Sequence, residues 1–152
     1  MILTMLSMAL MVGYLSIMAV RYGVQETVSS NYYSSSQKWI FSFVMVAAAF
    51  LLLPVLLEKG GDFQFLIFFS AMGLALVGVE PHYKSAFSRQ IHIGGALAAL
   101  FAGIGWCLTV NIWPTVIISS LYLLYFVFMG EYKYYIGEVL ALLDIYITVL
   151  IS

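Results

Sequence analysis

Residues 39–57 read WIFSFVMVAAAFLLLPVLL and contain no charged side chain. An apolar run of about 20 residues is the length that an α-helix needs to cross the hydrocarbon core of a bilayer. The same character extends over the whole chain, since 64% of its 152 residues are hydrophobic and only 9% are charged. A soluble domain has about 25% charged residues, and one of this size could not bury so much apolar surface. The composition therefore predicts an integral membrane protein.

Six apolar runs divide the chain. They cover residues 2–20, 39–57, 63–79, 91–110, 113–129 and 134–151. None has the two-residue alternation of a membrane β-strand. We therefore expect an all-α, polytopic bundle of about six transmembrane helices that forms a single integral membrane domain over residues 1–152. The first run has no basic residue before it, which favours a span that is retained over a cleaved signal peptide.

The basic residues predict the orientation of these spans. Five of the six lie in connections on one side of the predicted bundle, and Lys59 lies on the other; the five are Arg21, Lys38, Lys84, Arg89 and Lys133. Because lysine and arginine collect on the cytoplasmic side of membrane proteins, we expect both termini outside. The net charge of −1 offers no basis for nucleic-acid binding, so the bilayer is the expected partner.

Two predicted helices carry a stripe of small and polar residues that is typical of a helix–helix interface. The stripe of the fourth span contains His92, Gly95, Ala99, Gly103 and Trp106, and that of the sixth contains Gly137, Ala141, Asp144 and Thr148. Small residues let helices approach closely in lipid. We expect both stripes to face the interior of the bundle.

Asp144 and Glu138 are the acidic residues within the last span. Asp144 is about ten residues from the cytoplasmic end of its helix, hence on the order of 15 Å deep, where an ionised carboxylate costs about 2.5–3.5 kcal/mol. Asp144 is therefore either an ion, proton or ligand site or a protonated or hydrogen-bonded residue that holds helices together. Glu138 lies nearer the cytoplasm, and we expect it to pair with Lys133 or a neighbouring loop.

Both histidines lie in residues 79–92, VEPHYKSAFSRQIH. The simpler interpretation is a charged turn that ends one helix and starts the next, with His92 as a hydrogen-bonded packing residue. The alternative is that Glu80, His82 and His92 converge at the rim of a cytoplasm-facing pocket. A zinc site needs three or four ligands, which here would be His82, His92, Glu80 and Asp144. No ligand-spacing motif is present, so no cofactor is predicted and zinc is the alternative.

The other polar segment is SSNYYSSSQKW, residues 29–39. Its serines suit a helix cap, and Tyr32, Tyr33 and Trp39 suit the aromatic belt of a membrane interface. The alternative is a polar lid over the cytoplasmic mouth, in which Asn31 and Tyr32 would belong to a ligand pocket.

Residues 23–41 (GVQETVSSNYYSSSQKWIF), residues 78–84 (GVEPHYK) and the histidine that follows resemble a group of small, uncharacterised multi-pass membrane proteins of gut bacteria and their phages. In that group a Ser-Ile-Ser-Glu-Thr-Tyr-Tyr-like segment precedes the second span, a Val-Gly-x-x-Pro-x-Phe/Tyr-Lys segment ends the third, and a histidine opens the fourth. The corresponding pieces here are Val28 to Tyr33, Val77 to Lys84, and His92, with Ser30 and Asn31 in place of the glutamate and threonine. The resemblance implies a bacterial inner membrane and no particular activity.

A more distant resemblance is to the CREST superfamily of membrane hydrolases and receptors. Those proteins have seven spans and a serine, an aspartate and three histidines arranged for a metal. This chain has two histidines and six predicted spans, so it departs from the pattern at the catalytic residues.

Three functional hypotheses follow. The chain contains no phosphate-binding loop, nucleophile elbow or metalloprotease motif, which favours a non-enzymatic membrane protein with a small cytoplasm-facing polar pocket for a ligand or partner. The second hypothesis is ion or proton-coupled permeation that uses Asp144, for which a chain this short would need a homo-oligomer to enclose a pore. The third is a reduced, CREST-like, metal-dependent lipid hydrolase.

Overall fold

The computed structural model describes residues 1–59, 61–79 and 86–152. Its long helices are α1 (Ile2–Tyr22), α3 (Lys38–Lys59), α4 (Gln64–Val79), α5 (Ala86–Val110), α6 (Ile112–Phe128) and α7 (Lys133–Ile151). Three short helical segments complete this part of the chain: η1 (Val28–Ser30), α2 (Asn31–Ser34) and η2 (Gly61–Phe63). The described residues contain no strand, so the predicted all-α fold is confirmed.

Each predicted run is a helix, with one boundary that differs clearly. Helix α5 begins at Ala86, whereas its apolar run begins at residue 91. The polar residues Ser88, Arg89 and Gln90 extend the helix, because backbone hydrogen bonding does not require apolar side chains. The apolar run therefore marks the part of α5 that suits lipid, and the helix itself is longer.

Five helical segments of the described chain are long and apolar enough to cross a membrane: Ile2–Tyr22, Lys38–Lys59, Gly61–Val79, Ala86–Val110 and Lys133–Ile151. Helix α6 is also apolar but shorter, with 17 residues. These helices are compatible with a multi-pass membrane protein.

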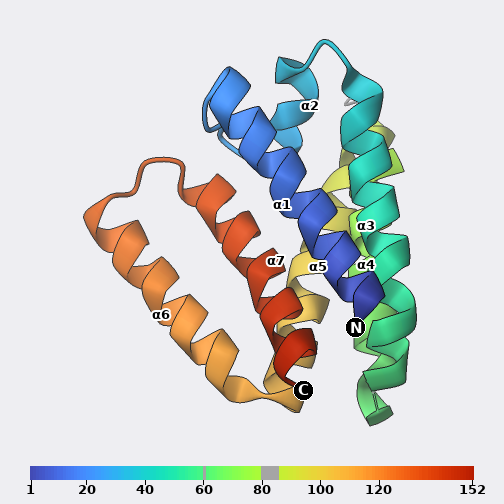
Figure 1. The fold of residues 1–152 in the computed structure, drawn as a ribbon. Coiled ribbons are helices and arrows are strands. Elements are labelled where there is room, and N and C mark those ends of the chain that lie inside the picture. Colours follow the sequence, from blue (N-terminus) through green and yellow to red (C-terminus); the bar gives the residue numbers. More distant parts are fainter. Residues whose placement is uncertain (60, 80–85) are drawn as a thin grey trace.

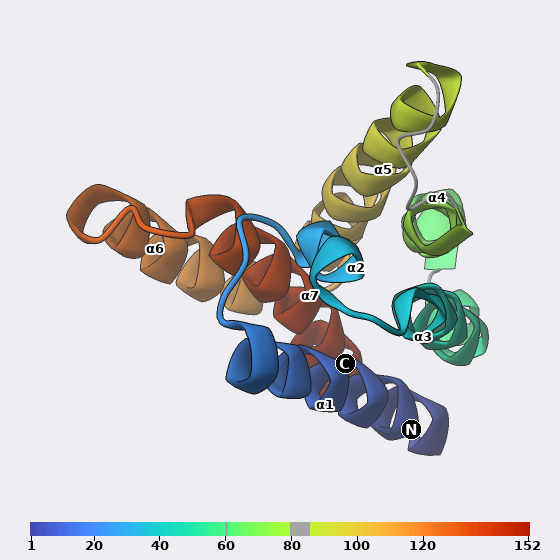
Figure 2. The ribbon, with the colours of Figure 1, turned by 90° about the horizontal axis from the view of Figure 1, so that it is seen from above.

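The helices run alternately up and down (Figures 1 and 2), and α1 packs chiefly against α3. Helices α3, α4 and α5 pack side by side as one group. Helix α7 contacts this group through α3 and α5, and it contacts α1 and α6 on its other sides. The connection that holds η1 and α2 lies over one end of the bundle, which we call the loop end; both termini lie at the opposite end.

Glycines bring α4 and α5 into close contact. A Cβ atom added to Gly73 would overlap the Gly95 carbonyl oxygen and lie 2.5 Å from the Ala99 amide nitrogen. The facing Gly95 is equally restricted, because its Cβ would lie 2.9 Å from the Gly73 carbonyl oxygen. The predicted small-residue stripe of α5 thus contacts a glycine of α4, which the sequence pattern alone did not identify.

A serine links three helices within the core. The Ser7 hydroxyl on α1 donates to the Ala48 carbonyl oxygen on α3 at 2.9 Å, and it lies 2.8 Å from the Tyr146 hydroxyl on α7. Since Ser7 has one proton to donate, Tyr146 is the donor of the second bond. Both side chains are almost fully buried, so their hydroxyl groups form these hydrogen bonds where no solvent can replace them.

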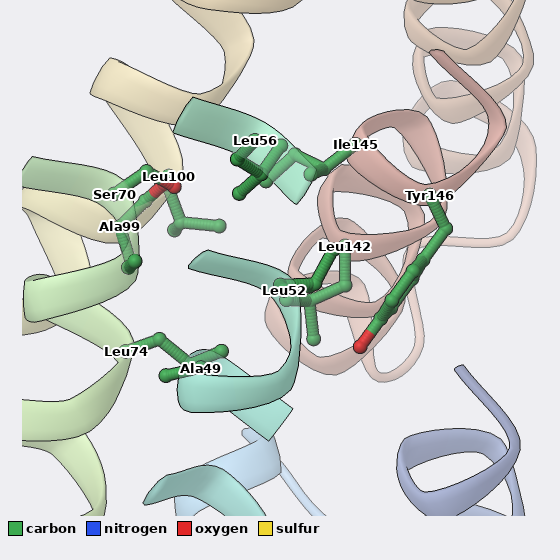
Figure 3. Close-up of a pocket in the computed structure, with 11 residues that line it drawn as sticks. Ala49, Leu52, Leu56, Ser70, Leu74, Ala99, Leu100, Leu142, Ile145 and Tyr146 are labelled. Carbon is green, nitrogen blue, oxygen red and sulfur yellow. The ribbon is translucent and has the colours of Figure 1, made fainter. Parts of the chain in front are cut away.

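The space between α7 and the α3–α4–α5 group is narrow and apolar near the middle of the bundle. Figure 3 shows Leu52 and Leu56 of α3 pointing toward Leu142 and Ile145 of α7. The cavity between them is about 30 Å³, room for no more than a few water molecules. The side chains of α3 and α7 therefore leave little empty space where they meet.

We predict that Gly73→Ala destabilises the protein by about 1–3 kcal/mol, because the added methyl group must push the backbone of α5 away. The measurement is thermal unfolding of the purified protein in detergent micelles. Gly94→Ala is the matched control, since a Cβ at Gly94 meets nothing within 4 Å; it should be neutral or slightly stabilising. Equal destabilisation by both substitutions would show that the α4–α5 contact is not as close as described.

Candidate functional site

A cavity of about 270 Å³ with a polar end lies at the loop end of the bundle, and we call it the loop-end cavity. Its polar lining comes from Thr27 and Ser29 of the connection above, His92 of α5 and Glu138 of α7. The rest of the lining is apolar and comes from α3, α4, α5 and α7: Met45, Leu74, Val77, Ile93, Ala96, Leu97, Leu100 and Leu142 among others. The cavity is therefore amphipathic, with its polar groups toward one end.

The tilt of α5 creates this cavity. Helix α5 touches α7 at Gly103, where a Cβ would lie 2.5 Å from Ile145 Cδ1. Toward the loop end α5 leans away from α7 (Figure 2). Ile93 and Leu97 line the cavity and are 42% and 49% exposed. The cavity thus opens sideways as well as toward the loop end.

Glu138 connects α7 to the connection above it. Its Oε2 atom accepts a hydrogen bond of 2.7 Å from the Val28 amide at the start of η1. The prediction that Glu138 binds a neighbouring loop is confirmed, whereas pairing with Lys133 is not observed. The Lys133 ammonium group instead lies over the rings of Phe126 and Tyr134, at 5.3 and 5.4 Å from their centroids.

His92 lines the loop-end cavity and is only 3% exposed, so its predicted position on the inner face of α5 is confirmed. Glu80 and His82 lie outside the described residues. Within the described part of the chain no three His, Cys, Asp or Glu side chains are grouped closely enough to hold a metal ion. Two of the four ligands considered for zinc also lie apart from each other, because His92 lines the loop-end cavity and Asp144 lines another cavity.

Asn31 and Tyr32 lie in α2, above the bundle and outside the loop-end cavity. Tyr32 was expected in the interface belt, but it is 3% exposed and packs edge-on against Phe41 at 6.0 Å between ring centroids. Burial, together with the nearby Tyr33, raises the pKa of Tyr32, so its hydroxyl stays protonated at neutral pH. Asn31 is fully buried beside Tyr135. Of the three predicted belt residues, Tyr33 and Trp39 are exposed.

A second cavity of about 340 Å³ lies between α5, α6 and α7, and we call it the Asp144 cavity. It extends along α7 from Tyr134 to Asp144, and Glu138 and Leu100 line both this cavity and the loop-end cavity. Asp144 is 2% exposed, which confirms its predicted position inside the bundle. The two cavities thus share one acidic lining residue, Glu138.

The surroundings of Asp144 are polar but poorly hydrogen-bonded. Its carboxyl group is close enough to interact with the hydroxyl groups of Thr115 on α6 and Thr148 on α7. Even so, Asp144 Oδ1 and both threonine hydroxyl oxygens have no hydrogen-bond partner among the described residues. Buried polar atoms are nearly always satisfied in proteins, so these three oxygen atoms form a polar group with hydrogen-bonding capacity left over inside the bundle.

Comparison with known proteins gives no match: no protein-family model, curated protein or solved structure is detectably similar to this chain. The resemblances to the gut-bacterial membrane proteins and to the CREST superfamily stay predictions.

Thr27 and Thr115 are site residues that sequence reasoning missed, whereas Ser29 is the first residue of the segment considered as a polar lid. Thr27 and Ser29 lie in a connection whose path over the bundle depends on the tertiary fold. Thr115 follows Pro114 in the first turn of α6, and a threonine within an apolar run is too common a feature to indicate a site. The pairing of Thr115 with Asp144 needed the packing of α6 on α7.

We predict that Glu138→Ala loosens the connection over the loop end, because the Val28 amide loses its acceptor. The measurement is hydrogen exchange of the Val28 amide in detergent micelles, which should become at least about tenfold faster, since a lost hydrogen bond to a charged group is worth about 1.5–3 kcal/mol. Glu26→Ala is the control, because Glu26 is an exposed residue of the same connection. Unchanged exchange in Glu138→Ala would contradict the contact.

Proposed function

We propose that this chain is an inner-membrane protein of six spans that binds a single-chain amphiphile in the loop-end cavity and does not act on it chemically. The observation that supports this most is the amphipathic lining of that cavity, with Glu138 and His92 at the polar end and leucines beyond. Ligand pockets are typically apolar clefts with a few placed polar groups. The sideways opening beside Ile93 and Leu97 gives a lipid-like molecule a route from the bilayer.

The charge of the site selects the head group. Glu138 is the acidic side chain of the lining, and one of its oxygens is already bonded to the Val28 amide. The described part of the lining contains no lysine or arginine. A carboxylate of this kind favours a head group that donates hydrogen bonds or carries positive charge, such as an amine. An anionic head group would meet an unfavourable charge at the same place.

The proposed orientation places the loop end in the cytoplasm. Arg21, Lys38, Arg89 and Lys133 lie at helix ends on that side, and Lys59 lies at the opposite end. Lys59 donates hydrogen bonds to the Val149 carbonyl oxygen at 2.8 Å and to the Ser152 hydroxyl at 3.3 Å. The excess of basic residues at the loop end supports a cytoplasmic location for it, and both termini then lie outside.

This topology predicts the labelling of single cysteines in intact bacterial cells. In a Cys107→Ala background, Ser152→Cys should react with a membrane-impermeant maleimide, and Glu131→Cys should react only after the cells are opened. Replacing Cys107 leaves the introduced cysteine as the one thiol of the chain. Because Cys107 is fully buried, its replacement does not change the surface of the protein. Labelling of Glu131→Cys in intact cells would reverse the orientation.

We predict that Ala96→Phe lowers the binding of a photoreactive long-chain amine by at least about tenfold, equivalent to 1.4 kcal/mol, because the ring fills the loop-end cavity. Labelling is measured by mass spectrometry of the purified protein after illumination. Ala98→Phe is the matched control: it lies on the same helix and lines neither cavity. The proposal fails if both variants are labelled like the wild-type protein.

A head-group comparison tests the role of Glu138. The wild-type protein should prefer the photoreactive amine to a photoreactive fatty acid of the same chain length, and Glu138→Gln should lose that preference while it retains an acceptor for the Val28 amide. A preference for the fatty acid would contradict the proposed head group.

A metal-dependent hydrolase is less well supported than ligand binding. Two of its four candidate ligands, Glu80 and His82, lie outside the described residues, and the other two line different cavities.

A further inference from the structure

Asp144, Thr115 and Thr148 form a second site that the proposed ligand does not use. The three residues are 2%, 4% and 0% exposed, so each is more than nine-tenths buried. Asp144 and Thr148 are one turn apart on α7, and Thr115 approaches them from the first turn of α6. Their oxygen atoms lie near one another, yet Asp144 Oδ1 and the two threonine hydroxyl oxygens lack a hydrogen bond of normal length in the described part of the chain.

No basic side chain of the described residues balances the charge of Asp144. The residues that interact with its carboxyl group are the two threonines, together with the buried Cys107 beside it. Lys59, the basic residue at the nearer end of the bundle, instead donates hydrogen bonds to Val149 and Ser152 at the end of α7. A buried carboxylate with no counter-charge is strongly unfavourable, so the ionised form requires a cation from outside the chain.

The Asp144 carboxylate and the two threonine hydroxyl oxygens are suitable ligands for a hard cation, since a hydroxyl oxygen can offer its lone pairs to the ion while its proton points elsewhere. One carboxylate balances one positive charge, which favours a monovalent over a divalent ion in a site of low dielectric constant. We propose that Asp144, Thr115 and Thr148 form a binding site for a small monovalent cation of the size of sodium. Binding of the ion supplies the counter-charge that Asp144 lacks and links α6 to α7.

The Asp144 cavity provides the route to this site. Its lining runs along α7 from Tyr134 at the loop end to Asp144, a distance of about 15 Å at the rise of an α-helix. Glu138 lines the cavity between these positions, and its negative charge favours a cation on the way. The site therefore communicates with the loop end through a cavity other than the loop-end cavity.

The experiment is sodium-dependent thermal unfolding of the full-length protein in detergent micelles, with choline chloride replacing sodium chloride at constant ionic strength. Sodium should raise the Tm of the wild-type protein to a saturating value, because a ligand that binds only the folded state stabilises it by mass action. Thr148→Val removes one oxygen ligand with little change in shape. It should weaken the apparent sodium affinity at least about tenfold, a loss of 1.4 kcal/mol, and Thr148→Ser should restore it.

Two further measurements make the result specific. Thr109→Val is the matched control, because Thr109 is an exposed residue whose hydroxyl donates to the Trp106 carbonyl oxygen of its own helix at 2.7 Å; its sodium dependence should equal that of the wild-type protein. Equilibrium binding of radioactive sodium should give one ion per chain for the wild-type protein and none for Asp144→Asn, whose folding is checked by its Tm in choline chloride.

Three results would overturn the proposal. The first is a wild-type Tm that does not depend on sodium. The second is a Thr148→Val variant that keeps full sodium affinity. The third is stability that responds to pH and not to sodium, with Asp144→Asn as stable as the wild-type protein, because Asp144 would then be a protonated residue that donates to the threonines. The amphiphile experiments on Ala96 and Glu138 are unaffected by any of these results.

Discussion

The contact between α5 and α7 at Gly103 is the constraint on which the rest of the structure depends. Ile145 and Ser70 occupy the space that a side chain at Gly103 would fill, so the two helices meet there and can diverge on either side. Toward the loop end the divergence opens the loop-end cavity, and beside it the gap to α6 opens the Asp144 cavity. A larger residue at position 103 would move α5 outward and change both cavities together.

The bilayer explains why polar groups matter so much in this bundle. Within lipid, a buried hydroxyl or carboxylate has no water to bind and must find its partner inside the protein. Ser7 and Tyr146 meet this requirement with each other and with Ala48, and Glu138 meets it with the Val28 amide. Asp144, Thr115 and Thr148 do not meet it within the described chain. The satisfied groups hold helices together, whereas these three residues are the basis of the proposed cation site.

Glu138 has a double role because it lies where the two cavities adjoin. Its carboxylate holds η1 over the loop end and also lines both cavities. Occupation of either cavity by a positively charged group changes the charge balance at this one residue. The two proposed ligands, an amphiphile with an amine head group and a small cation, would therefore influence each other's binding through Glu138. Because both are positively charged, each would weaken the binding of the other.

The sequence by itself determined the helical class, the approximate limits of the long helices and the inner faces of α5 and α7. Hydropathy and residue spacing are local properties, and the bilayer makes them decisive. Only the tertiary structure decided that His92 and Glu138 share a cavity, that Tyr32 is buried, and that Thr115 lies beside Asp144. These relations join residues far apart in the chain, and they depend on helix tilt and on close contacts at single glycines. The pattern of residues along the sequence does not specify which helices pack against each other.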